Sequence, residues 1–117
     1  MKTKEDAVAF CRSLPDSYED YPFRDGDWTV MRRRSNRKSF ALIFERQGCV
    51  WINVKCRPEE AAFWRGLYPG SLLPAYHMNK EHWNSLLLNG GIPGEELRRM
   101  IAESHRLVET PQRRKRR

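Results

Sequence analysis

The sequence predicts an α+β domain in which an antiparallel sheet carries the N-terminal and C-terminal helices on one face. Three observations support this fold class: helical spacing of apolar residues near the N-terminus, three alternating segments in the middle, and a second helical pattern at the end. With 117 residues and 39% hydrophobic content, the chain can bury one core. We therefore expect one domain over residues 1–110, followed by a disordered basic tail at 111–117.

The first helix is predicted to begin after Thr3, a good N-cap residue, and to end at Pro15. Between them, Ala7, Cys11 and other apolar residues recur at helical spacing. Residues 16–27 combine acids, aromatic side chains, Pro and Gly. This composition predicts a loop.

Three strands are predicted to follow as an antiparallel meander. They comprise residues 28–33, 39–45 and 49–55. The alternation places Phe40, Leu42 and Phe44 on one apolar face. We expect the opposite, uncovered face to carry polar groups together with Met31 and Trp51.

The last third of the chain mixes short elements with one long helix. The expected elements are a short helix at 58–66, a loop at 69–74, an extended segment at 76–78, a turn at 79–83, a strand at 85–88 and a helix at 93–108. Pro58 and Pro93 suit the first turns of the two helices. Apolar residues on the last helix recur at the spacing of a single buried face.

The formal net charge of +7 is concentrated in two clusters. The first lies on the hairpin between the first two predicted strands and consists of Arg32, Arg33, Arg34, Arg37 and Lys38; the second is the tail, with Arg113, Arg114, Lys115, Arg116 and Arg117. A projecting basic hairpin can follow phosphates, although a charged turn also prevents strand edges from pairing. Likewise, a basic tail can add phosphate contacts or merely increase solubility.

The segment from Tyr76 to Val108 has the most specific pattern in the chain. Five polar or aromatic residues, His77, Asn79, Lys80, His82 and Trp83, precede an apolar run, a Gly-Gly turn and a helix that opens with proline. This segment resembles the MmcQ/YjbR family of small bacterial proteins, many of which are labelled as DNA-binding. The resemblance implies a compact frataxin/CyaY-like fold over most of residues 3–109. It also implies DNA as a partner.

The five-residue motif has three interpretations. As a binding surface, Asn79 and Lys80 could contact bases or phosphates while Trp83 stacks. As a catalytic site, a histidine could act as a general base, but no G-x-S-x-G, H-E-x-x-H or phosphate-cradling loop accompanies it. As a structural element, Asn79 and Lys80 would set a turn while His77 and Trp83 fill the interface between sheet and helix. We expect no catalytic residue and no enzyme activity.

Neither a metal site nor a cofactor is expected. The three cysteines contain no C-x-x-C pair, and the acids of residues 16–27 show no ligand spacing, so a frataxin-like fold alone does not predict iron handling. No apolar run approaches the roughly 18 residues that cross a bilayer. The N-terminus carries acids where a secretory signal needs apolar residues. We therefore expect a cytoplasmic monomer without a membrane partner.

Together these observations predict a non-enzymatic domain that binds DNA through the hairpin, the motif and the tail. Its contacts should be mainly to phosphates, with weak sequence preference, because no recognition helix is visible. The alternative is a protein-interaction or regulatory adaptor that binds an unknown protein partner on the uncovered sheet face.

Overall fold

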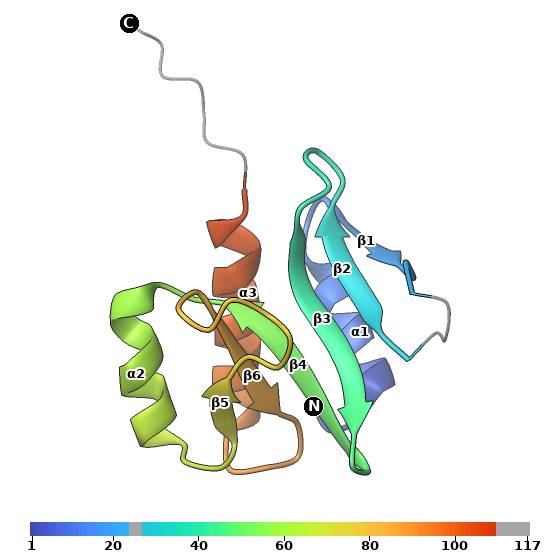
Figure 1. The fold of residues 1–117 in the computed structure, drawn as a ribbon. Helices are drawn as coiled ribbons and strands as arrows, with labels where there is room; N and C mark the ends of the chain where they lie inside the picture. Colours follow the sequence, from blue (N-terminus) through green and yellow to red (C-terminus); the bar gives the residue numbers. More distant parts are fainter. Residues whose placement is uncertain (24–26, 110–117) are drawn as a thin grey trace, which may run out of the picture.

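Residues 1–23 and 27–109 are described by a computed structural model, in which one antiparallel sheet carries three helices (Figure 1). The strand order is β1-β2-β3-β4-β6-β5. The strands are β1 (Ser17–Asp20), β2 (Thr29–Arg33), β3 (Ser39–Arg46), β4 (Cys49–Lys55), β5 (Leu72–Pro74) and β6 (Trp83–Leu87). The helices are α1 (Lys4–Ser13), α2 (Pro58–Leu67) and α3 (Gly94–Leu107). The predicted α+β class is confirmed.

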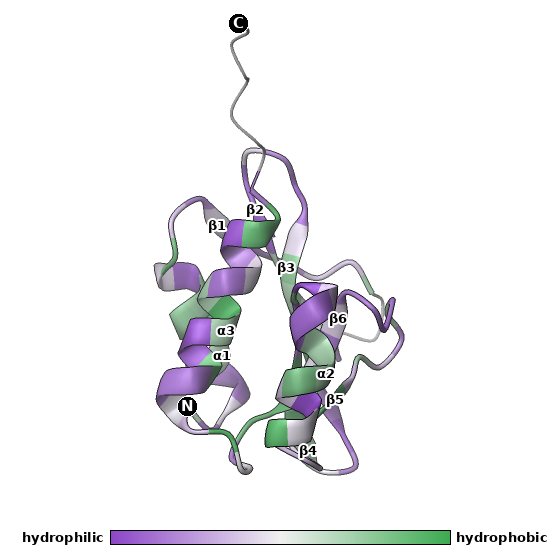
Figure 2. Cartoon of the chain, turned by 90° about the vertical axis from the view of Figure 1, so that its left-hand side faces the viewer, coloured by the Kyte–Doolittle hydropathy of each residue, from purple (hydrophilic) through white to green (hydrophobic). Residues whose placement is uncertain are grey.

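The two terminal helices cover the same face of the sheet. Figure 2 shows α1 and α3 together on one side of β3. A capping box between Thr3 and Asp6 begins α1, and each helix presents a short apolar stripe to the strands. Ala7 of α1 and Ile101 of α3 are fully buried in one core cluster with Ile52 of β4. Burial of this stripe is what fixes both helices on the sheet.

The strand register corrects two predictions about side-chain direction. Met31 pairs with Ala41, but its neighbour Arg32 pairs with Ser39, so Phe40 is the extra residue of a β-bulge. The bulge turns Phe40 toward the helices, where it is fully buried, while Leu42 and Phe44 stay on the opposite face. Met31 is also fully buried beneath the helices and not on the uncovered face.

Two predicted loops contain strands. Residues 17–20 pair with β2, and residues 72–74 pair with β6, so the expected three-stranded meander is the centre of a six-stranded sheet. Both are short edge strands: β1 is largely polar, and β5 is three residues long and ends in proline. Residues 76–78, predicted to be extended, form a turn in which His77 has φ of 62°.

An aromatic cluster covers the middle of the face that no helix contacts. The ring of Trp28 stacks on Phe44 with centroids 4.3 Å apart, and Tyr76 lies 5.6 Å from Phe44. The guanidinium of Arg46 lies 4.4 Å above the Tyr76 ring. The segment that contains the five-residue motif is thereby packed onto the outer face of the sheet.

Candidate nucleic-acid interface

The β2–β3 turn is held by hydrogen bonds within the hairpin. The backbone N–H of Arg37 donates to the carbonyl of Arg33 at 2.7 Å, and the N–H of Arg33 donates to the carbonyl of Lys38 at 3.0 Å. The side chain of Asn36 accepts from the N–H of Lys38 at 2.9 Å. These bonds define the backbone of the hairpin tip, so its basic side chains extend from a preorganised turn.

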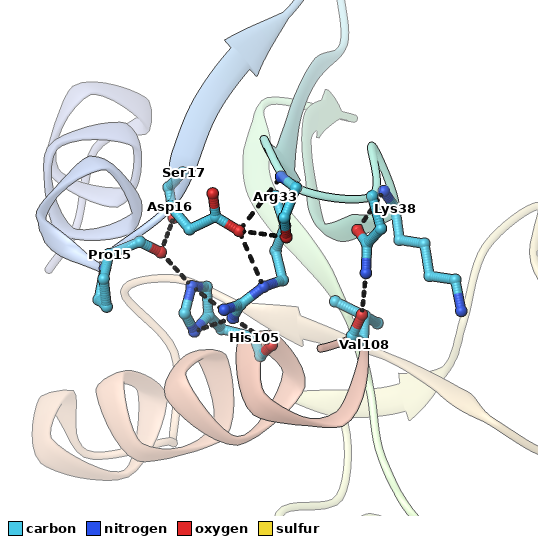
Figure 3. A network of polar contacts seen from close by, with 9 residues as sticks. Pro15, Asp16, Ser17, Arg33, Lys38, His105 and Val108 are labelled. Carbon is cyan, nitrogen blue, oxygen red and sulfur yellow. Dashed lines mark hydrogen bonds and ion pairs between the residues drawn. The ribbon is translucent and has the colours of Figure 1, made fainter. Parts of the chain in front are cut away.

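The hairpin is also fastened to the end of α3. The Asn36 amide donates to the carbonyl of Val108 at 2.8 Å. On β2, Arg33 points toward the helices and is only 8% exposed, and its Nη1 donates to the carbonyl of His105 at 3.0 Å. Figure 3 shows how these contacts join the hairpin to the helix. Arg33 is therefore a structural member of the cluster, not part of its exposed surface.

Asp16 closes this network from the segment after α1. Its carboxylate lies 3.4 Å from Nε of Arg33 and accepts a hydrogen bond from the Ser35 hydroxyl at 2.6 Å. The hydrogen bond from Ser35 is the main reason why the pKa of Asp16 is lowered. The carboxylate thus stays charged beside Arg33, and it ties the hairpin tip to the first helix as well as to the last.

The hydrogen bonds of His105 define its tautomer. Nε2 lies 2.6 Å from the carbonyl oxygen of Pro15, which can only accept, so Nε2 carries the proton. Nη1 of Arg33 lies 2.9 Å from both ring nitrogens, and of these only the unprotonated Nδ1 can accept from it. Burial is the main cause that lowers the pKa of His105, and the Arg33 charge lowers it further, while the Pro15 contact opposes both. The ring is therefore neutral at pH 7 and compatible with its cationic neighbour.

The remaining cations of the hairpin face outward. Arg34, Arg37 and Lys38 are exposed, whereas Arg32 is half-buried and forms an ion pair of 2.7 Å with Asp20. An open depression of about 520 Å³ lies over β1 and β2 and is lined by Tyr18, Asp20, Arg32, Arg34 and Arg37. Three guanidinium groups in one hollow form a surface that suits a phosphate-bearing ligand.

Sequence reasoning missed the two β1 residues of this depression. The Arg34 guanidinium lies 5.4 Å from the centroid of the Tyr18 ring, and Asp20 neutralises Arg32. Both residues were assigned to a loop because residues 16–27 are polar. Their alternation with Ser17 and Glu19 was the available signal, since side chains on one face of a strand recur at every second position.

The five-residue motif begins with a turn that Asn79 organises. Its side-chain oxygen accepts from the N–H groups of Glu81 at 2.8 Å and His82 at 3.3 Å, and its carbonyl accepts from the N–H of Trp83 at 3.0 Å. The carbonyl of Lys80 accepts from the guanidinium of Arg65 on α2. These contacts favour the structural interpretation of Asn79, and they leave the Lys80 ammonium free to extend from the turn.

The other motif residues divide between surface and sheet. His77 is exposed, and its ring lies 4.0 Å from that of Tyr76. His82 is half-buried, and its carbonyl accepts from the N–H of Cys56 at 2.7 Å. Trp83 is half-buried on β6, where it pairs with Lys55. His77, Asn79 and Lys80 are therefore the exposed residues of the motif, and His77 does not fill the interface between sheet and helix that the structural interpretation gave it.

The structure places the basic hairpin and the Asn79 turn at the same end of the sheet without joining them. The turn lies at the start of β6, beyond the paired ends of β4 and β6, and the hairpin tip lies at the same end of β2 and β3. No backbone hydrogen bond connects the two among residues 1–23 and 27–109. The cations of residues 113–117 lie outside the described residues, although Val108, near the start of that run, contacts the hairpin.

The described residues offer little metal or thiol chemistry. Within the part of the chain that the structure describes, no group of three or more His, Cys, Asp or Glu side chains could hold a metal ion. Cys11 is buried, which raises the pKa of its thiol to about 12, while Cys49 is exposed and Cys56 is half-buried. None of the helices described is long and apolar enough to cross a membrane.

The fold and its surface define a small α+β domain whose basic hairpin is attached to its last helix. The YjbR family model matches residues 12–107, and the chain belongs to that family. The uncharacterized protein YyaQ of Bacillus subtilis is 31% identical over 119 residues, which cover 92% of this chain and 99% of YyaQ. The uncharacterized protein YjbR of Escherichia coli is 22% identical, with coverage of 88% and 84%.

Solved structures of similar proteins confirm the architecture. A crystal structure from Pseudomonas syringae superimposes with a TM-score of 0.82 at 28% identity, covering 92% of this chain and 99% of the other. The Deinococcus radiodurans protein DR2400, with a DUF419 domain, gives a TM-score of 0.83 at 34% identity, with coverage of 92% and 79%. The expected family and fold class are thus confirmed, while the likeness to frataxin stays a prediction.

Proposed function

We propose that this domain binds DNA, mainly through phosphate contacts made by the outward cations of the β2–β3 hairpin. The observation that supports the proposal is the combination of exposed Arg34, Arg37 and Lys38 with a tip whose backbone is already fixed. Like charges repel one another, and phosphates relieve that repulsion. Because the tip is preorganised, binding orders side chains only and not the backbone.

The binding should depend weakly on sequence. The N-terminal half of α3 exposes a mixture of acidic and basic side chains, including Glu95, Arg98 and Arg99, while its apolar stripe is buried. Such a helix does not resemble one that reads base edges in a major groove. The proposed domain is a non-enzymatic, cytoplasmic monomer, and a reducing compartment suits its three free thiols.

A salt titration tests the proposal. Binding of a fluorescently labelled 20-base-pair duplex is followed by anisotropy between low and physiological salt, with the intact chain and an Arg34→Gln/Arg37→Gln/Lys38→Gln variant. If all three side chains contact phosphates, the slope of log K against log salt falls in magnitude by about 2 to 3. A second duplex of unrelated sequence should bind with similar affinity.

A charge-matched control separates this site from overall charge. Lys2, Arg98 and Arg99 are exposed; Lys2 precedes α1, and the two arginines lie in the N-terminal half of α3, whereas the hairpin bonds to the residue after its C-terminal end. Replacing all three by Gln lowers the net charge by the same amount. The control variant should retain most of the slope. An equal loss in both triple variants, or no binding of either duplex at low salt, would refute the proposed site.

The contribution of the basic run at 113–117 is measured with a separate truncated variant. A variant that ends at Thr110 should reduce the slope further if both features contact the same duplex. If truncation alone abolishes binding and the hairpin variant binds like the intact chain, the run acts as a nonspecific polycation. That outcome would also contradict the hairpin proposal.

A second candidate function is capture of an acidic, partly apolar protein segment on the outer sheet face. A depression of about 140 Å³ there is lined by Trp51, Leu73, Arg46 and Lys80, among others. Leu73 is 37% exposed beside the half-buried Trp51. Partner capture should then be lost in Trp51→Ala and retained in the chain that ends at Thr110. Retention of every partner by Trp51→Ala would rule out this function.

A further inference from the structure

A cavity lies between α2 and α3, away from the basic hairpin. Its volume is about 300 Å³, at the lower end of the roughly 300–1,000 Å³ that small-molecule sites occupy. Val54 of β4 and Leu86 of β6 form an apolar floor on the helix-covered face of the sheet. Trp64 of α2 and Met100 of α3, both half-buried, stand on either side. A flat apolar group would fit between them.

One end of the cavity holds two arginines from different helices around a single carboxylate. Arg57, at the start of α2, lies 3.9 Å from Oε2 of Glu103 on α3, and Arg106 lies 2.6 Å from the same oxygen. Nε of Arg106 also donates to Oε1 of Glu103 at 3.1 Å. The carboxylate of Glu103 thus occupies a position in which two guanidinium groups converge.

The internal carboxylate is held weakly enough to be exchanged. The side chains of Arg57 and Arg106 are 46% and 54% exposed, and that of Glu103 is 35% exposed. Ion pairs at this exposure stabilise a protein little, because water screens them. A ligand carboxylate can therefore replace Glu103 between the two arginines at small cost, while the displaced side chain turns to solvent.

The charges of the lining favour an anion. The residues of the lining include four cations, Lys55, Arg57, Arg99 and Arg106, against two acids, Glu60 and Glu103, and Arg99 also pairs with Glu96 outside the lining at 3.4 Å. The thiol of Cys56 also lines the cavity, and because burial raises its pKa it adds no negative charge at neutral pH. An excess of positive charge beside an apolar slot attracts a molecule that has both a carboxylate and an apolar body.

We propose that this cavity is a binding site for a small aromatic or similarly flat carboxylate. The apolar body of the ligand lies between Trp64 and Met100, and its carboxylate takes the place of the Glu103 carboxylate between Arg57 and Arg106. This site is separate from the hairpin, so its test does not depend on whether the domain binds DNA.

The test uses 2-naphthoate and its neutral isostere 2-naphthamide as probes in an NMR titration of the isotope-labelled intact chain. The acid should shift the amide signals of residues that line the cavity, such as Cys56, Asn84 and Met100, and bind about tenfold or more tightly than the amide. In the Arg57→Gln/Arg106→Gln variant, the acid should bind no better than the amide. Glu103→Gln should bind the acid several-fold more tightly, because the competing carboxylate is gone.

A matched pair of substitutions on α2 tests the apolar slot. Trp64→Leu removes the indole wall and should weaken 2-naphthoate by about tenfold, whereas Phe63→Leu changes a side chain that is 62% exposed outside the cavity and should have no effect. The dispersion of amide signals confirms that each variant is folded. Equal affinities for acid and amide, shifts located elsewhere, or no shift at millimolar acid would overturn the proposal.

Discussion

Replacement of Arg33 by Gln should lower the free energy of unfolding by about 2 to 3 kcal/mol. The guanidinium is 8% exposed, and it donates to the carbonyl and to the neutral ring of His105. Hydrogen bonds from charged groups stabilise proteins by roughly 1.5 to 3 kcal/mol each. The ion pair with Asp16 adds less, because that carboxylate is 28% exposed and is also held by Ser35. The amide of the introduced glutamine can still donate a hydrogen bond, so the loss of unfolding free energy should not exceed about 3 kcal/mol.

Urea unfolding at pH 7 measures this loss, and the neighbouring Arg32→Gln variant is its control. Arg32 lies on the same strand but faces the opposite side, where it forms a partly exposed ion pair with Asp20. Its replacement should change stability by less than about 1 kcal/mol. Arg33→Gln should also lower the melting temperature by roughly 10 °C. Equal losses of stability in Arg33→Gln and Arg32→Gln would refute the conclusion that Arg33 is a structural residue while the other cations of the hairpin face outward.

Two further predictions concern His105 and Asn79. Because the pKa of His105 in the folded protein lies below the unfolded value of about 6.5, its contribution to stability is complete above that pH. It is lost as pH falls from about 6.5 toward the folded pKa, by at most about 1.4 kcal/mol per pH unit, and a urea series from pH 5 to 7.5 should show a flatter profile for His105→Gln. If His105→Gln showed the same dependence of stability on pH as the intact chain, His105 would not be a buried neutral ring. Asn79→Ala should lower stability by about 1 kcal/mol, because the N–H of Glu81 loses its acceptor and that of His82 keeps only the backbone carbonyl of residue 79, whereas Asn79→Asp keeps an accepting side-chain oxygen and should lose less. Equal losses in thermal unfolding would show that the side chain does not organise the turn.

The direction of Arg33 could have been predicted, but its partners could not. Thr29, Met31 and Arg33 alternate along β2 and all face the helices, so once Met31 is placed in the core, Arg33 must follow it. A buried guanidinium requires acceptors. The residue that supplies two of them, His105, lies 72 positions further along the chain. No local pattern connects positions so far apart.

The strands that sequence reasoning missed share a physical cause. Residues 17–20 are polar and half-buried, and they form a strand because β2 offers them a free edge, not because of their own propensity. The bulge at Phe40 was also missed, because strict alternation predicts Phe40 on the same face as Leu42 and the register shift is visible only in the pairing of β3 with β2. The helices, in contrast, were predicted closely because capping residues and helical periodicity are local signals.

The Arg33 network also bears on how the two basic features could act together. Asn36 of the hairpin tip bonds to Val108, which stands five positions before the basic run at 113–117 in the sequence. Under the DNA proposal, a phosphate group held by one feature brings neighbouring phosphates within reach of the other, which raises their effective concentration. If the two basic features bound DNA independently, removal of one would leave the affinity of the other nearly unchanged. If they bind the same duplex together, removal of either lowers the affinity of the chain for DNA strongly. Under the same proposal, the contacts of Arg33 and Asn36 contribute without touching the ligand, because they hold the hairpin against the end of α3, the element that precedes the basic run in the sequence.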